Sequence, residues 1–178
     1  GSQIMENWAA DPEVLKMYAR HFKTGEPIPD ELLAKMQKSR FFNQGFDTVE
    51  YLAASFLDMD WPTLAAAVEP ETAKFEAESM ARIGLIPEIV SRYRSPYFTH
   101  IFSGGYSAGY YSYIWAEVLD ADAFQAFKET SLFDRATAES FRKNVLERGG
   151  TEDPMVLYTR FRGREPKIEA LLRKRGLD

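Results

Sequence analysis

The sequence contains no cysteine and only two histidines among its 178 residues. Without cysteine, the chain has no disulfide, no iron–sulfur cluster, no zinc site with cysteine ligands and no thiol nucleophile. The two histidines, His21 and His100, lie far apart in the sequence. An H-E-x-x-H zinc helix needs two histidines four residues apart, so this sequence does not contain one.

The chain also has little excess of either charge, because 27 acidic and 22 basic residues give a formal net charge of −5. The acidic excess lies in residues 1–90, with a net charge of −7, whereas residues 91–178 carry +2. A mildly acidic chain is a poor candidate for non-specific nucleic-acid binding, and we expect no nucleic-acid partner. The basic stretch over residues 160–175 is typical of a last helix whose cations lie near its negative end. Nucleic-acid binding through that stretch is the alternative.

The longest run without a charged residue covers residues 95–116 and contains His100 and three glycines. These polar and small residues argue against a membrane span, so we expect no membrane partner. Residues 1–11 have neither the basic start nor the apolar stretch of a signal peptide. Together with the lack of cysteine, this favours a cytoplasmic protein.

Apolar residues recur with a helical period along most of the chain, and alternation typical of strands is nearly absent. Asp11 followed by Pro12 is typical of a helix start, and glycines at 149, 150 and 163 are typical of helix ends. We therefore expect an all-α fold with residues 1–178 as a single helical unit. Helices are expected from Asp11, from Asp30, from Asp47 to Trp61, and near residues 70–83, 121–128, 134–147, 154–161 and 166–175.

Two further expectations concern packing. The helix from Asp47 is expected to bury one apolar face, made of Val49, Leu52, Ala53, Phe56 and Leu57. Trp8 and Trp61 are expected to anchor the core or a domain interface. The chain is amphipathic from its third residue, without a polar lead-in, which is consistent with a start inside a larger structure; a helix that simply begins early is the alternative.

Residues 95–116 contain eight aromatic side chains, a far higher density than the 14% of the whole chain. Glycines at positions 104, 105 and 109 lie among them. Glycine allows a backbone to approach a ligand closely, and tyrosine carries a hydroxyl on a rigid ring. The combination is typical of a substrate-facing loop, although composition alone favours an aromatic core stripe.

Two short motifs in this run are poor matches to known chemistry. Residues 105–109 match G-x-S-x-G, but a nucleophile elbow needs its histidine after the serine, and both histidines precede Ser107. Gly104 and Gly109 have the spacing of a phosphate loop, but the lysine that should follow is absent. A dinucleotide fingerprint also fails, because position 106 is tyrosine where glycine is needed. We therefore expect neither a serine hydrolase nor a nucleotide-binding loop.

Tyr106, Tyr110 and Tyr113 follow a helical spacing, but seven residues of straight helix span about 10.5 Å. Two phenols that far apart would hardly reach one atom. If the chain folds back at Gly104 and Gly105, Tyr106 and Tyr113 can converge on a single oxygen. Donors directed at an oxyanion are worth on the order of 3–4 kcal/mol each.

Residues 97–115, YFTHIFSGGYSAGYYSYIW, resemble the substrate loop of the thimet oligopeptidase/neurolysin family of zinc metallopeptidases. The closest similarity is to the bacterial peptidyl-dipeptidase branch. The resemblance extends along the chain through SQIMENW at 2–8, FNQGF at 42–46, EYLAA at 50–54, RYRS at 92–95 and FRGREP at 161–166. The last of these motifs is shared with the oligopeptidase A branch.

This resemblance implies a mainly helical enzyme with a deep channel that admits short peptides. Family members bind zinc through H-E-x-x-H and a glutamate on a later helix, in a stretch that ends E-x-P-S-Q. Only Ser2 and Gln3 match that stretch, so the resemblance implies that the zinc ligands precede residue 1. The chain would then be the C-terminal part of a neurolysin-like catalytic domain, with zinc in the full-length parent, no metal ligand of its own and no activity alone.

The resemblance also assigns roles to residues of the loop. His100, Tyr106 and Tyr113 match catalytic positions that bind the peptide and stabilise the tetrahedral intermediate. Gly104, Gly105 and Tyr110 match the substrate-binding loop that closes over the peptide. The implied activity is the release of C-terminal dipeptides from oligopeptides.

Two alternatives remain: an oligopeptidase A-type endopeptidase and a non-enzymatic helical module that binds peptides. The expected partners are an oligopeptide substrate and the remainder of the parent catalytic domain. Self-association is also expected if an apolar patch is exposed near residues 3–8 or 97–115.

Overall fold

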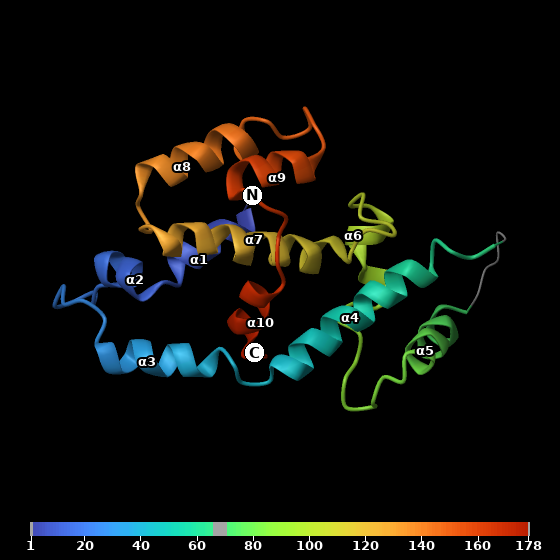
Figure 1. Ribbon diagram of the computed structural model, residues 1–178. Helices are drawn as coiled ribbons and strands as arrows, with labels where there is room; N and C mark the ends of the chain where they lie inside the picture. The colour runs from blue at the N-terminus through green and yellow to red at the C-terminus, as the bar shows by residue number, and fades with distance from the viewer. Residues whose placement is uncertain (1, 66–70, 178) are drawn as a thin grey trace. The chain divides into compact units, whose positions relative to one another are not determined.

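The computed structural model describes residues 2–65 and 71–177, whose regular structure is helical (Figure 1). These residues contain no strand, and one isolated bridge joins Arg20 to Pro27. The predicted all-α fold is therefore confirmed. The elements in chain order are α1 (Ser2–Ala9), α2 (Pro12–Tyr18), α3 (Asp30–Ser39), α4 (Gln44–Asp60), α5 (Thr72–Arg82), the short 3₁₀ turn η1 (Ser95–Tyr97), α6 (Thr99–Phe102), α7 (Ser112–Glu129), α8 (Arg135–Phe141), the π-helical turn η2 (Arg142–Leu146), α9 (Pro154–Arg162) and α10 (Glu169–Arg175).

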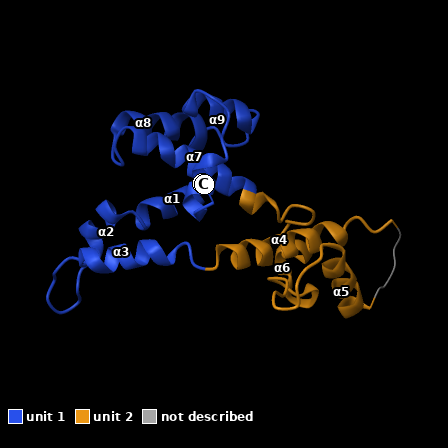
Figure 2. Ribbon diagram, turned by 60° about the horizontal axis from the view of Figure 1, so that its bottom comes forward, with its two compact units in different colours: residues 1–42, 115–178 blue, residues 43–114 orange. Residues whose placement is uncertain are grey.

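Two compact units make up the chain (Figure 2). The first unit combines residues 1–42 with residues 115–178, and the second unit comprises residues 43–114. The expectation of a single helical unit over residues 1–178 stays a prediction. Each unit has its own hydrophobic cluster.

Several helices begin where the sequence places a capping residue. The Asp11 side chain accepts a hydrogen bond from the backbone N–H of Glu13 at 2.9 Å, which caps α2. The carboxylate of Glu71 does the same for the first amides of α5. That helix therefore begins at Thr72, and Pro70, which lay in its predicted range, is outside the described residues. Helix α7 is longer than the predicted 121–128, because no glycine or proline after Gly109 interrupts it.

The first unit is built around apolar side chains of α1, α7, α8 and α9. Its buried members are Ile4, Ala123, Phe124, Phe127, Phe141 and Tyr158. The Trp8 ring meets the rings of Phe124 and Phe127 edge-on, with centroids 4.7 and 4.6 Å apart. Its indole N–H donates to the Leu132 carbonyl at 2.8 Å. Trp8 thus anchors this core, as predicted.

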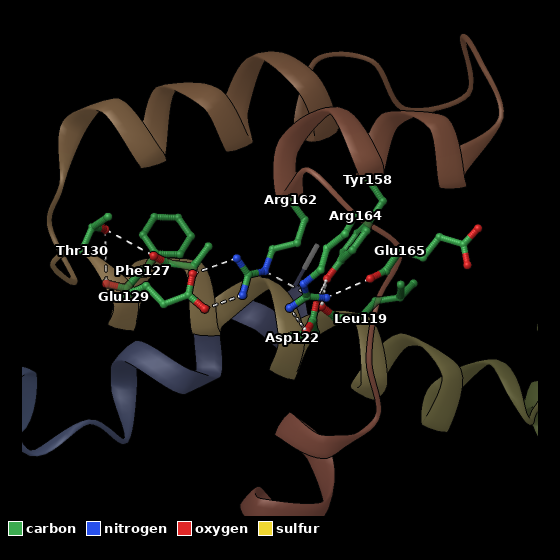
Figure 3. A network of polar contacts seen from close by, with 10 residues as sticks. Leu119, Asp122, Phe127, Glu129, Thr130, Tyr158, Arg162, Arg164 and Glu165 are labelled. Carbon is green, nitrogen blue, oxygen red and sulfur yellow. Dashed lines mark hydrogen bonds and ion pairs between the residues drawn. The ribbon is translucent and has the colours of Figure 1, made fainter.

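A buried ionic network joins α7 to α9 in the first unit (Figure 3). Asp122 is 2% exposed and accepts hydrogen bonds from the Tyr158 hydroxyl at 2.5 Å and from Arg164 at 2.8 and 3.0 Å. Burial alone would raise the pKa of Asp122, but the bonds from Arg164 and Tyr158 outweigh it and hold that pKa below its ordinary value. Arg162, in turn, forms a two-bond ion pair with Glu129.

The second unit packs α4, α5 and α6 around an aromatic cluster. Its buried members are Ala54, Phe98, Ile101 and Tyr110. The Trp61 ring lies 4.1 Å from that of Phe75, and its indole N–H donates to the Ser95 hydroxyl at 2.8 Å. Trp61 therefore anchors this second cluster.

The predicted apolar face of α4 is only partly buried. Ala53 and Leu57 are fully buried and Leu52 is half-buried, as the helical period predicts. The predicted burial of Val49 and Phe56 is wrong, because their side chains are 38% and 49% exposed. A helical period identifies an apolar face, but burial requires another element to cover it.

Candidate functional site

The aromatic-rich run of residues 97–115 is not one continuous loop. It passes through the end of η1, helix α6 and an irregular segment over residues 103–111, and then enters α7 at Ser112. We call residues 103–111 the tyrosine loop. Ser107 lies within this loop and follows α6 rather than a strand, which agrees with the sequence argument against a nucleophile elbow.

Two glycines reverse the chain at the start of the tyrosine loop. A Cβ atom at Gly104 would lie 2.8 Å from the carbonyl oxygen of His100, which is too close for any side chain. Gly105 has a φ of +78°, in the left-handed region that glycine adopts without strain. The Tyr106 N–H then donates to the His100 carbonyl at 2.9 Å. The reversal expected at this glycine pair is present, and it returns Tyr106 to the end of α6.

This reversal brings the three predicted catalytic residues together. The imidazole of His100 lies 6.1 Å from the Tyr106 ring and 6.2 Å from the Tyr113 ring, measured between centroids. The two tyrosine rings stack on each other at 5.5 Å with an angle of 17° between their planes. Residues that are 13 positions apart in the sequence therefore form one cluster.

Two tyrosine hydroxyls at this site, those of Tyr113 and Tyr110, have a raised pKa. Burial and a side-chain hydrogen bond with Tyr106 raise the pKa of Tyr113 above its ordinary value. Burial likewise raises the pKa of Tyr110. A phenol must be protonated to donate a hydrogen bond, so the raised pKa of Tyr113 suits a donor.

Exposure separates the tyrosines into two groups. Tyr106 is 40% exposed and Tyr113 is half-buried, so both reach the surface of the cluster. Tyr110 is only 4% exposed, and its ring packs 5.1 Å from those of Phe98 and Tyr113. In this conformation Tyr110 is a packing residue, and its substrate-binding role stays a prediction.

His100 is half-buried and has one unpartnered nitrogen. Its Nδ1 atom is shielded from solvent and has no hydrogen-bond partner among residues 2–65 and 71–177. Buried polar atoms are almost always hydrogen-bonded, so an exception calls for an explanation. A polar group of a bound ligand would be one such partner.

Helix α4 supplies two residues that the sequence argument missed. The Asp58 carboxylate is fully buried and accepts hydrogen bonds from the N–H groups of Ala108 and Tyr110, both at 2.8 Å. The Tyr51 hydroxyl donates to the Tyr110 carbonyl at 2.8 Å and accepts from the Ile114 N–H at 3.1 Å. Tyr51, Ala54 and Asp58 lie on one face of the helix, and an acidic residue on an otherwise buried face was the available signal.

The described residues do not fit the zinc ion that the family resemblance implies. Across residues 2–65 and 71–177, no three His, Asp or Glu side chains lie close enough together to hold a metal. His100, the histidine of this site, is surrounded instead by the rings of Tyr93, Phe98 and three further tyrosines.

Among the described helices, none combines the length and apolar character required to cross a membrane.

The chain that carries this aromatic site is similar to proteins of a known family. The model of peptidase family M3 matches residues 1–177. The chain belongs to peptidase family M3. It is 45% identical to a dipeptidyl carboxypeptidase of Salmonella typhimurium and 44% identical to oligopeptidase A of Escherichia coli. It is 32% identical to saccharolysin of Saccharomyces cerevisiae.

These alignments cover 99% of this M3 chain but only 26%, 26% and 25% of the three relatives. The chain therefore spans about a quarter of the length of the curated relatives it matches. The resemblance noted in the sequence is confirmed at the level of the family. The names of the relatives include both branches, dipeptidyl carboxypeptidase and oligopeptidase A.

Proposed function

We propose that this chain forms the substrate-facing side of a metallopeptidase that releases C-terminal dipeptides from oligopeptides. The observation that supports this proposal is the cluster in which His100 lies beside the stacked rings of Tyr106 and Tyr113. The 45% identity to a dipeptidyl carboxypeptidase supports the same activity. The almost equal identity to oligopeptidase A, at 44%, makes an endopeptidase the second candidate.

The chemistry proposed for the cluster is hydrogen-bond donation to a peptide carbonyl. Tyr106 and Tyr113 carry phenols on neighbouring rings, which suits them to donate to one oxygen as negative charge develops on it. His100 would bind the peptide through its unpartnered ring nitrogen. The glycine pair at 104 and 105 lets the backbone approach the substrate, and the loop that carries Tyr110 would close over it.

In the proposed enzyme, the metal ligands lie in a part of the protein outside residues 1–178. The relatives have room for such a part, since they are about four times as long as this chain. When bound, zinc supplies an activated water and polarises the scissile carbonyl. This chain alone would then lack activity, and the remainder of the catalytic domain would be its partner. We also propose that the protein is cytoplasmic, that it binds no nucleic acid and that the isolated chain self-associates.

Product analysis tests this function. A longer protein that contains this chain, loaded with zinc, is incubated with an oligopeptide, and the products are identified by mass spectrometry. An otherwise identical peptide with an amidated C-terminus serves as the control substrate, because a dipeptide-releasing enzyme must recognise the free carboxylate.

Sequential loss of dipeptides from the free C-terminus, with slower cleavage of the amidated peptide, is the expected result. Internal cleavage of both peptides at equal rates would favour the endopeptidase. Binding of the peptide without cleavage by a zinc-loaded protein would overturn the enzymatic proposal and favour a binding module.

A further inference from the structure

A fully buried carboxylate lies directly beneath the tyrosine loop. Asp58, near the end of α4, has 0% of its surface exposed. Among residues 2–65 and 71–177, its hydrogen-bond partners are the backbone N–H groups of Ala108 and Tyr110, and no cation lies within ion-pair distance of it. Burying a carboxylate is costly unless donors face it, so the loop and this side chain depend on each other.

The loop backbone has an uncommon conformation at Ala108, one of the two residues whose N–H donates to Asp58. Ala108 has a φ of +54°, a left-handed conformation that residues other than glycine seldom adopt. It stands between Gly105, which is also left-handed, and Tyr110. Residues in such conformations persist where surrounding contacts hold them, and the hydrogen bond from the Ala108 N–H to the Asp58 carboxylate is such a contact.

Tyr51 contacts the carbonyl group of Tyr110, the loop residue whose N–H donates to Asp58. Its hydroxyl donates to the Tyr110 carbonyl and accepts from the Ile114 N–H, so α4 contacts both the N–H and the C=O of Tyr110. The Tyr113 N–H donates to that same carbonyl at 3.3 Å. On the other side, the Gly109 N–H donates to the Tyr106 carbonyl at 2.8 Å. The backbone that Asp58 fixes is therefore hydrogen-bonded directly to both proposed donors.

We propose that Asp58 is a positioning residue for the peptidase site: its carboxylate fixes the backbone of residues 108–110 and thereby sets where Tyr106 and Tyr113 present their hydroxyls. This inference rests on the proposed function of the two tyrosines. Asp58 itself is buried beneath the loop and does not reach the substrate. It acts through geometry, and a small displacement of a donor is enough to lower the rate on the order of 10²-fold.

The test uses the longer, zinc-loaded protein that contains this chain. Asp58→Ala removes both acceptors, and Asp58→Asn retains one oxygen but turns an amide donor toward a backbone N–H. The matched control is Asp60→Asn, two residues along the same helix. The Asp60 carboxylate accepts from Ser79 and pairs with Arg82, and both of these partners lie outside the tyrosine loop.

Hydrogen exchange is the first readout, because it reports on the loop without requiring activity. In Asp58→Ala, amides within residues 103–111 are expected to exchange at least about tenfold faster, the factor that corresponds to losing one hydrogen bond to a charged acceptor. Asp58→Asn should show the same change if the alanine variant does not fold. Exchange in this segment should be unaltered in Asp60→Asn, and unaltered exchange in both Asp58 variants would overturn the proposal.

Kinetic coupling between Asp58 and Tyr106 is the second readout. A residue that only stabilised the fold would not show such coupling. Asp58→Ala is expected to lower kcat on the order of 10²-fold, with a smaller change in KM, while Asp60→Asn stays close to the parent. Combining Asp58→Ala with Tyr106→Phe should cost less than the product of the two separate losses, because both act on the same donor. Fully multiplicative losses would overturn the positioning role.

The two proposals fail in different ways. If Tyr106→Phe alone leaves peptide hydrolysis unchanged while Asp58→Ala still speeds exchange in the loop, the proposed function of the tyrosine is wrong and the Asp58 contact stands. If Tyr106→Phe lowers kcat but Asp58→Ala changes neither exchange nor kcat, the proposed function stands and the positioning role is wrong.

Discussion

Replacing Asp122 by alanine is expected to destabilise the first unit by about 3–5 kcal/mol, since removing one member of a buried ion pair leaves the other without a partner. The carboxylate is 2% exposed and accepts three hydrogen bonds, one from Tyr158 and two from Arg164. The Arg164 side chain is 34% exposed and can still reach water, which places the expected loss toward the lower end of that range. Tyr158→Phe removes a single bond to a charged acceptor, and about 1.5–3 kcal/mol is expected for it.

Native-state hydrogen exchange measures this loss where it occurs. The free energy of opening is determined for amides of α7 and α9 in the parent and in each variant, because these helices carry the two sides of the network. The matched control is Glu152→Gln, which breaks an exposed ion pair with Arg160. Exposed pairs contribute little to stability, so protection in α9 should scarcely change in the control.

The order of the three variants decides the outcome. Asp122→Ala is expected to lose the most protection, Tyr158→Phe less and Glu152→Gln the least. Equal losses in Asp122→Ala and Glu152→Gln would show that burial of the network does not matter, and the reasoning would be refuted.

Two remaining predictions concern acid and the glycine pair. Because the pKa of Asp122 is lowered on folding, its stabilising contribution is present above the unfolded-state pKa of about 3.9 and is lost as the pH falls through the lower folded-state value. Acid titration of stability should therefore be less steep in Asp122→Asn than in the parent, and equal slopes would count against the linkage. Gly104→Ala would force a Cβ atom to 2.8 Å from the His100 carbonyl, so we expect faster hydrogen exchange in the tyrosine loop and a lower kcat. The same substitution at Gly45, which has open space around it, is the control.

Local signals in the sequence predicted much of the fold. Asp11 followed by Pro12 marked the start of α2, and the Asp153 cap with Pro154 agrees with a helix start at that point. The extent of α7 was underestimated, because the density of aromatic side chains suggested a loop up to residue 115. Backbone propensity did not support that choice, since residues 112–129 contain neither glycine nor proline. Burial of Phe56 was overestimated because a helical period does not reveal what covers a face.

The candidate site was predictable only in part. The glycine pair and the tyrosine spacing led to a chain reversal that brings Tyr106 close to Tyr113, and the structure has that arrangement. The burial of Tyr110 could not be predicted, because it depends on packing against Phe98, which lies between η1 and α6. Asp58 was missed because its partners are backbone amides about 50 positions away, and backbone amides have no signature in the sequence.

The most direct test of the central claim is the effect of a single hydroxyl group. In the longer, zinc-loaded protein, kcat for oligopeptide cleavage is compared between Tyr113→Phe and Tyr111→Phe, at equal zinc content. Tyr111 is the matched control, because it is the last residue of the tyrosine loop, only two positions before Tyr113, and is 54% exposed. Tyr113→Phe is expected to lower kcat about 10²–10³-fold, as loss of an oxyanion donor does, while Tyr111→Phe should remain close to the parent. Equal kcat values in the two variants would contradict the claim that Tyr113 donates to the developing oxyanion.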